Sequence, residues 1–372
     1  MLKPTLVSPF PVRYEARFEH LEDDEAATEK GLLETLRGIS EKTATATAEG
    51  HGLRSVHAKS HGLLRGELRV LTGLPPVLAQ GLFTSPMAYP IVMRLSTIPG
   101  DLLHDRVSTP RGMAIKVVGV EGERLAGTEG QVTQDFVLVN GPRFAAPTGK
   151  GFLKGLKLLA STTNKAPGLK KVFSAVARGA EKVIESVGGE STTLKSIGGH
   201  PETHILGETF YSQVPMLLGP YMAKLSVVPV SPGMLLLKNA HLDLHDKPNG
   251  LRDAVLDFFS SHSAEWEVRL QLCTDINLMP IEDALAEWPE AVSAYLPVAR
   301  VTVPPQTAWS EARSAVIDDT YSFSPWHGLA AHRPLGAIMR LRKSAYEMSA
   351  QLRASQNRQA IQEPRSLDDL PD

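Results

Sequence analysis

The chain has 372 residues, of which 42% are hydrophobic and 22% are charged, and its formal net charge is −2. This length and composition are typical of a soluble globular protein with a substantial core. The near-neutral charge argues against nucleic-acid binding, which usually requires a basic domain. The single cysteine, Cys273, excludes an intramolecular disulfide and a multi-cysteine zinc site. Its apolar setting in "RLQLCTDINL" predicts a buried strand residue rather than a nucleophile.

The first 50 residues predict a helical extension. The start, "MLKPTLVSPFPVRYEARFEH", lacks the basic-then-apolar order of a secretory signal, and no window approaches the length of a membrane span, so we expect a cytoplasmic protein. Residues 24–38 begin with acidic residues and carry Leu32, Leu33 and Leu36 at helical spacing. This pattern predicts an amphipathic helix.

Short strand-like segments dominate the rest of the chain. Between residues 54 and 144 they are "GELRVLTG", "IVMRLSTI", "GMAIKVVGV" and "QDFVLVN", and further along they are "ETFYSQVPMLLG", "YMAKLSVVPVS", "EWEVRLQLCTD" and "VARVTVPPQ". Gly, Pro and Asp turns separate them. Such spacing favours an antiparallel barrel or sandwich over a parallel sheet with crossover helices.

Residues 150–187 form a basic segment between these strand regions. Val172, Val176, Val183 and Val187 recur at helical spacing. Eight basic residues accompany only Glu181 and Glu185: Lys150, Lys154, Lys157, Lys165, Lys170, Lys171, Arg178 and Lys182. A basic amphipathic segment can lie on a membrane surface or receive an acidic, lipid-like substrate. A solvated helix packed on the barrel is the interpretation we favour.

The end of the chain predicts a helix over about residues 335–353, followed by an acidic, proline-containing tail over 355–372 that we expect to be flexible. No internal repeat or low-complexity tract interrupts the pattern. We therefore expect a single domain over residues 1–372, with the N-terminal extension and the basic segment as helical additions.

Three segments, taken in order, resemble the haem catalases. "VHAKSHGLLRGEL" is similar to the segment that carries the distal histidine of that family, and "IVMRLSTIPGD" with "TPRGMAIKV" is similar to a strand pair that follows it. "LRKSAYEMSAQLR" reproduces the intervals of the proximal helix of the family. The resemblance covers about residues 54–140 and 208–353. It implies an α+β fold in which an antiparallel β-barrel encloses haem b between flanking helices, and it favours the small catalase-related subgroup.

Arg342, Tyr346 and Arg353 carry the proximal resemblance, which implies that Tyr346 is the iron ligand. A tyrosine ionises near pH ~10, so binding Fe(III) as a phenolate requires a cation beside the oxygen. Residues four apart share one face of a helix, which places the Arg342 guanidinium next to the Tyr346 oxygen.

His57 stands between Val56 and Ala58, just before the first strand. The resemblance implies that His57 lies over the haem face opposite Tyr346, accepts a proton from bound peroxide and returns it to the departing oxygen. It also places Ser96 against the far nitrogen of His57, Val56 beside the cofactor, and Arg54, Arg94 and Arg353 at the haem propionates. We expect His61 to be structural.

Asn140 marks the main departure from the family, which carries two adjacent asparagines at this point. Only Asn140 is present here, one residue late in an ungapped match that leaves Val139 in the active position. A bulge would be needed to turn Asn140 towards the haem as a catalytic residue. Leu95 also replaces an aromatic residue of the family, and there is no room for the long N-terminal arm and C-terminal helical domain of large catalases.

Three functional hypotheses follow. The first is a haem-dependent hydroperoxidase that acts on hydrogen peroxide or on an organic or fatty-acid hydroperoxide. The second is a fatty-acid hydroperoxide lyase or dehydratase, which the basic segment favours and Val56 disfavours, because rearranging relatives tend to carry threonine there. The third is a haem-binding protein with little turnover. We expect no nucleic-acid partner, a homodimer, and peripheral membrane contact only through the basic segment.

Other histidines offer weaker signals. His327 and His332 lie in "SFSPWHGLAAHRPLG" without an evident set of metal-ligand partners, and "HLDLHD" contributes His241 and His245 in a pattern more typical of a polar strand end. We expect none of them to bind a metal.

Overall fold

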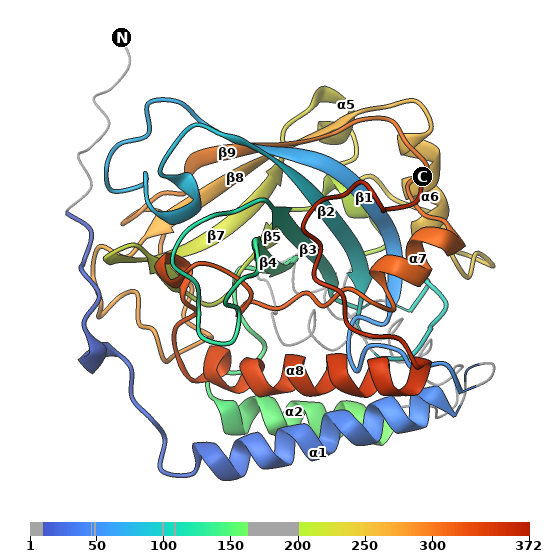
Figure 1. The fold of residues 1–372 in the computed structure, drawn as a ribbon, viewed down its shortest axis with the longest axis horizontal. Helices are drawn as coiled ribbons and strands as arrows, with labels where there is room; N and C mark the ends of the chain where they lie inside the picture. Colours follow the sequence, from blue (N-terminus) through green and yellow to red (C-terminus); the bar gives the residue numbers. More distant parts are fainter. Residues whose placement is uncertain (1–9, 46, 48–49, 99, 108, 163–200) are drawn as a thin grey trace, which may run out of the picture.

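The computed structural model describes residues 10–45, 47, 50–98, 100–107, 109–162 and 201–372 (Figure 1). Nine antiparallel strands form one sheet in the order β5-β4-β3-β2-β1-β9-β8-β7-β6, and a pairing between β5 and β7 closes eight of them into a barrel, from which β6 extends. The strands are β1 (Lys59–Val70), β2 (Ala88–Thr97), β3 (Arg111–Val118), β4 (Thr133–Val139), β5 (Phe210–Tyr211), β6 (Met216–Leu218), β7 (Tyr221–Pro229), β8 (Ala264–Leu272) and β9 (Leu296–Val303). The predicted antiparallel barrel is confirmed.

The barrel interior is the main hydrophobic core. Successive side chains of a strand point to opposite faces, so Met113, Ile115 and Val117 of β3 point inwards, where they join buried residues from every other strand, including Trp266. Cys273 is also fully buried, as its sequence context predicts. The side chains that β3 directs into the barrel are therefore apolar. Any polar chemistry on β3 has to use its outward-facing residues.

The outer wall formed by β1–β4 is different, because several of its buried residues are polar or charged. Arg94, Ser96 and Lys116 point outwards yet are at most 4% exposed. The helix α7 (Glu311–Ile317) and the segments on either side of it cover this wall with a second apolar cluster that includes Tyr321 and Phe323. The polar groups on this wall are thus shielded from solvent by α7 and its flanking segments, and not by the barrel itself.

Three long helices form a layer along one side of the barrel (Figure 1). They are α1 (Glu25–Ala44), α2 (Gly149–Thr162) and α8 (Ala337–Asn357), and they pack through leucines of α1 and α2 against Leu341 and Ala345 of α8. The helices predicted over 24–38 and 335–353 are present, and each continues for about one further turn or more. α2 begins the predicted basic segment, whose remaining residues, 163–187, lie outside the described part of the chain.

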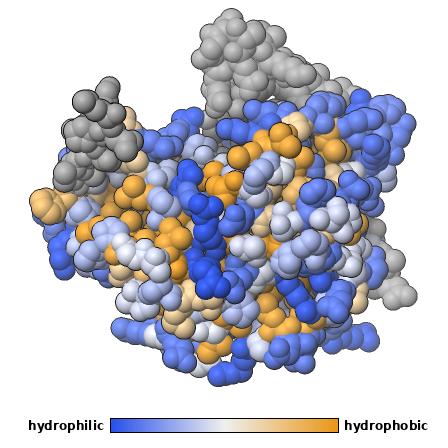
Figure 2. All heavy atoms as spheres, turned by 90° about the horizontal axis from the view of Figure 1, so that it is seen from above, coloured by the Kyte–Doolittle hydropathy of each residue, from blue (hydrophilic) through white to orange (hydrophobic). Residues whose placement is uncertain are grey.

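Short helices complete the fold. They are η1 (Ala16–Phe18), η3 (Gly81–Phe83), η5 (Ile205–Gly207), α5 (Pro232–Leu235), α6 (Gly250–Phe259) and η6 (Ala330–His332). On the face shown in Figure 2, hydrophobic residues occur in several groups between hydrophilic ones. A scatter of this kind does not by itself indicate a docking face.

The C-terminal segment corrects one expectation. We expected a flexible tail over residues 355–372, but α8 runs to Asn357 and the residues after it pack on the outer wall. Gln362 forms a bridge with Tyr321, Glu363 pairs with Lys116, and Leu370 is 3% exposed. Acidic composition suggested fraying, but a buried lysine and an apolar cluster on the wall anchor the segment.

Candidate active site

The backbone of His57 has an uncommon conformation. Its φ of 55° lies in the left-handed region, which residues other than glycine adopt rarely. The next residue, Ala58, accepts a hydrogen bond through its carbonyl from Nη2 of Arg94 at 3.1 Å. A side chain of β2 therefore holds the turn that presents His57 at the start of β1.

The His57 ring lies on the outer wall against β2 and β3. Its Nδ1 is 3.2 Å from Oγ of Ser96, as the sequence predicted. Gly112 of β3 pairs with Ser96, and a Cβ atom at this glycine would lie 2.6 Å from both Cε1 and Nδ1 of the ring. Any larger residue at position 112 would displace the imidazole.

The His57 imidazole is neutral over the physiological pH range. Burial lowers its pKa most, and the positive charges of Arg94, Arg342 and Arg54 lower it further, to about 3. Because Arg342 belongs to α8, its effect on His57 shows that this part of α8 and the His57 turn lie within electrostatic range of each other.

Arg342 and Tyr346 meet on α8 as their spacing predicts. Nη2 of Arg342 donates a hydrogen bond to the Tyr346 hydroxyl at 2.7 Å, and Nη1 lies 3.6 Å from the Met339 sulfur. Tyr346 is half-buried. A guanidinium in direct contact with a phenol stabilises its ionised form.

Arg54, Arg94 and Arg353, hereafter the arginine cluster, come together from three distant parts of the chain. Nη2 of Arg54 and Nη2 of Arg353 both donate to the carbonyl of Tyr321 at 3.0 Å. Nε of Arg94 donates to Oδ1 of Asp318 at 2.6 Å. The sequence indicated these arginines through the family resemblance but gave no sign of Asp318.

The arginine cluster is rich in positive charge. Burial lowers the pKa of Arg353 to about 10, with the charge of Arg94 acting in the same direction. Burial and the charges of Arg353 and Arg94 hold the pKa of Arg54 well below its usual value. The Nε atom of Arg54 is buried without a hydrogen-bond partner, which leaves a donor available to an anion.

Asn140 is held by a hydrogen-bond network with Arg111 and Glu208. Its Oδ1 accepts from the backbone N–H of Arg111 at 2.8 Å, and its Nδ2 donates to Glu208. Directly paired residues of neighbouring strands point to the same face, and Val139 pairs with Gly112, on which His57 rests. Val139 therefore shares the face of His57, whereas Asn140 follows it and is held in another network. Its catalytic role stays a prediction.

Val56 is half-buried and packs against the cluster formed by α1, α2 and α8. It thus adjoins the layer that contains Tyr346. Its predicted contact with a cofactor also stays a prediction.

The chain matches known proteins when structures are compared, but not when its sequence is compared with protein families or curated proteins. No protein-family model matches the chain, and no curated protein matches its sequence. The solved structures that match include three with 15% identity: a fungal catalase (TM-score 0.57), catalase A from Saccharomyces cerevisiae (0.58) and a bacterial catalase (0.58). The matches cover 81%, 81% and 94% of this chain, and 59%, 61% and 64% of those chains.

This chain has the catalase fold. The likeness extends over most of its length, but the chain spans less than two thirds of the length of each of these catalases. The expected fold is confirmed, and the activity of this catalase-like chain has to be argued from its own residues.

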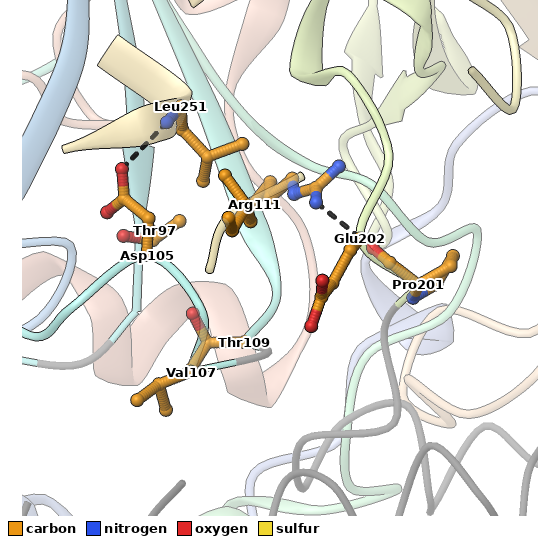
Figure 3. A pocket seen from close by; sticks show the side chains of 9 residues that line it. Thr97, Asp105, Val107, Thr109, Arg111, Pro201, Glu202 and Leu251 are labelled. Atoms are coloured by element: carbon orange, nitrogen blue, oxygen red, sulfur yellow. Dashed lines mark hydrogen bonds between the residues drawn. The ribbon is translucent and has the colours of Figure 1, made fainter. Parts of the chain in front are cut away.

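A small polar cavity lies near the His57 turn and was not evident from the sequence. It has a volume of about 10 Å³, enough for one water, and Thr97, Asp105 and Arg111 line it (Figure 3). His61 contacts its wall, since Nε2 is 2.9 Å from Oγ1 of Thr97. His61 is fully buried, in agreement with the structural role predicted for it.

His327 has carboxylate neighbours, contrary to expectation. Ligand atoms of Asp135, His327 and Glu363 all lie within 4.8 Å of one another. The ammonium of Lys116, however, pairs with both carboxylates. These four residues, hereafter the lysine cluster, already contain their own cation. Sequence inspection missed the group because Lys116 and Asp135 lie more than 180 residues before His327 and Glu363.

Proposed function

We propose that this catalase-like chain is a haem-dependent hydroperoxidase, acting on hydrogen peroxide or on an organic hydroperoxide. The observation that carries the proposal is the 2.7 Å hydrogen bond between Arg342 and Tyr346, within electrostatic range of the neutral His57. A phenol beside a guanidinium would provide an anionic iron ligand, and the imidazole within electrostatic range of the same guanidinium would provide a proton acceptor. Haem b, when bound, would supply the redox-active iron.

The donor set of the site fits haem. Tyr346 would hold the iron as phenolate, and Arg342 would compensate the charge of the oxygen. Arg54, Arg94 and Arg353 would bind the propionates, and the buried, unpartnered Nε of Arg54 is a donor suited to a carboxylate.

His57 would move the proton. Its neutral imidazole can accept the proton of a hydroperoxide, and Nδ1 remains oriented by Ser96. Because its pKa is about 3, the imidazolium would be a strong acid and would return the proton readily to the departing oxygen. A single residue can thus serve both halves of O–O heterolysis.

A haem-binding protein with little turnover is the second candidate. It is favoured by the neighbours of His57 on the wall, because Val139 offers no hydrogen bond and Asn140 is engaged by Arg111 and Glu208. Substrate would then be oriented by His57 alone.

One set of measurements separates these candidates. Purified chain is titrated with haem and its absorption spectrum recorded for wild type and Tyr346→Phe; the loaded protein is then assayed for oxygen evolution from hydrogen peroxide and for consumption of a linoleate hydroperoxide. A tyrosinate-type spectrum lost in the variant, with peroxide turnover, supports the hydroperoxidase. The same spectrum without turnover supports the second candidate, and rearranged lipid products support a lyase or dehydratase. An identical spectrum in both proteins contradicts the proposal.

The remaining expectations stay predictions of the proposal: a peroxide or lipid hydroperoxide as substrate, a homodimer, and a cytoplasmic location. No helix among the described residues is both long and apolar enough to cross a membrane. Peripheral membrane contact was tied to the basic segment, most of which lies outside the described residues.

A further inference from the structure

Asp318 is a buried carboxylate at the centre of the arginine cluster. It directly follows α7, and its side chain is 15% exposed. Besides the bond from Arg94, its Oδ2 accepts from Oγ of Ser60 at 2.7 Å and from Oγ of Ser314 at 2.9 Å. Burial would raise the pKa of Asp318, but the charges of Arg94 and Arg54 outweigh it and lower that pKa. The carboxylate is therefore ionised.

The charges around Asp318 do not balance. Among the described residues, Asp318 is the carboxylate that accepts hydrogen bonds from the cluster, whereas Arg54 and Arg353 donate to main-chain carbonyls. Asp319 is a second carboxylate, and its charge acts on both Arg54 and Arg353. Three guanidinium groups and two carboxylates leave one positive charge, beside the buried Nε donor of Arg54 that has no partner. Such a buried excess is costly unless an anion completes it.

Arg94 connects this charge balance to His57. One nitrogen of its guanidinium binds Asp318, and another donates to the carbonyl of Ala58, next to His57. The orientation that Asp318 imposes on Arg94 is thus transmitted to the turn that presents the imidazole.

We infer that Asp318 is a positioning residue: it is a built-in counter-ion that holds Arg94 in place and leaves the arginine cluster an excess positive charge for an anionic ligand edge. The inference rests on the proposed function, in which the two haem propionates are that edge. It predicts that Asp318 competes with the ligand for positive charge, and a purely structural aspartate would not do so.

The test compares haem, which has two carboxylates, with haem dimethyl ester, which has none, on the purified apo chain. Affinities are measured by absorbance titration, and Tm is measured with and without ligand. The variants are Asp318→Asn, Arg94→Gln, the Asp318→Asn/Arg94→Gln double variant, and Glu311→Gln. Glu311 is the matched control, because it is an exposed carboxylate in the first turn of α7, the helix that directly precedes Asp318.

Asp318→Asn should lower the Tm of the apo chain yet bind haem more tightly, on the order of tenfold, because the excess positive charge of the cluster rises by one. A ligand that binds only the folded state raises Tm by mass action, so the haem-induced rise should exceed that of wild type. Binding of the ester and the behaviour of Glu311→Gln should stay as in wild type. Equal losses of Tm with and without haem would overturn the inference.

If Asp318→Asn does not fold, the double variant tests the role of Asp318 instead. Arg94→Gln lowers the excess positive charge by one and should reduce the haem-to-ester affinity ratio by roughly tenfold. The double variant returns the excess to its wild-type value and should restore the ratio. A ratio as low as that of Arg94→Gln alone refutes the role of Asp318. If wild type binds neither haem nor the ester, the proposed function itself fails, which is a separate outcome.

Discussion

Two groups of buried charges lie on the outer wall of the barrel, on either side of one aromatic ring. The guanidinium of Arg54, in the arginine cluster, lies 5.7 Å from the centre of the Phe323 ring, and the ammonium of Lys116, in the lysine cluster, lies 5.5 Å from it. Both clusters are covered by the segments around α7 and by the C-terminal segment. They share their surroundings and differ in their charge balance.

In the lysine cluster, a cation lies between two carboxylates. Lys116 is fully buried and faces the carboxylates of Asp135 and Glu363, with His327 3.3 Å from Asp135. Arg124 adds a second positive charge that interacts with both carboxylates. The opposite charges raise the pKa of Lys116 despite its burial. The arginine cluster instead has more guanidinium groups than carboxylates. On one wall, therefore, equal numbers of opposite charges hold the fold together, and an excess of positive charge indicates a binding site.

The largest effect should come from a substitution of His57 in the candidate active site. With haem bound, His57→Ala should lower peroxide turnover by roughly 10²–10⁴-fold, the usual contribution of general acid–base catalysis, without loss of haem. The check is the rate of linoleate hydroperoxide consumption per haem. His262→Ala is the control, since that histidine is exposed; His61 is unsuitable because it is fully buried. Wild-type turnover in His57→Ala would return His57 to a structural role.

The variant Lys116→Met tests the contribution of the lysine cluster to stability. Removing this cation leaves the carboxylate of Asp135, which is fully shielded from solvent, without its partner. Breaking a buried pair in this way costs about 3–5 kcal/mol of unfolding free energy, measurable by urea denaturation. Lys157→Met, at an exposed position of α2, should be nearly silent. Haem binding by the folded fraction of Lys116→Met should be unchanged, and a selective loss of haem would show that the two clusters are not independent.

Arg342→Leu should have an intermediate effect. Arg342 donates a hydrogen bond to the Tyr346 oxygen, and a partner that supports a metal ligand in this way usually contributes about 10–100-fold to affinity. Haem retention should therefore weaken by roughly tenfold or more, measured by transfer of haem to an acceptor protein. Lys343→Leu is the matched control on the same helix, because it pairs only with Glu347, at 3.3 Å, near solvent. Retention equal to wild type would contradict the pairing of Arg342 with Tyr346.

The smallest effect concerns pH. The pKa of His57 falls to about 3 in the fold, and burial also lowers that of His332 to about 4. An unfolded histidine titrates near pH ~6.5, so between these values the unfolded chain binds more protons than the folded one. Stability should thus be full above pH ~6.5 and fall as pH decreases towards 4, by up to about 1.4 kcal/mol per pH unit for each histidine. Denaturant titrations at several pH values measure the slope, and His57→Gln should make it shallower; an unchanged slope would show that His57 titrates normally.

Much of the fold was accessible from the sequence because it depends on local periodicity. Alternating apolar residues such as Met113, Ile115 and Val117 predicted the strands, and an interval of four residues was enough to bring Arg342 to Tyr346, since a helix places such residues on one face. The barrel followed from the number and spacing of the strands together with the family resemblance.

The tertiary structure decided the contacts between residues that lie far apart in the sequence, because local periodicity carries no information about them. Asp318 reaches Arg94 across more than 200 residues, and Glu363 reaches Lys116 across a similar span. Such pairs depend on which segment covers which wall of the barrel. The register of β3 with β4 likewise decided that Val139, rather than Asn140, lies on the face that supports His57. A shift of one residue in a strand reverses the direction of every side chain, so this outcome depends on the pairing of whole strands and not on the identity of any one residue.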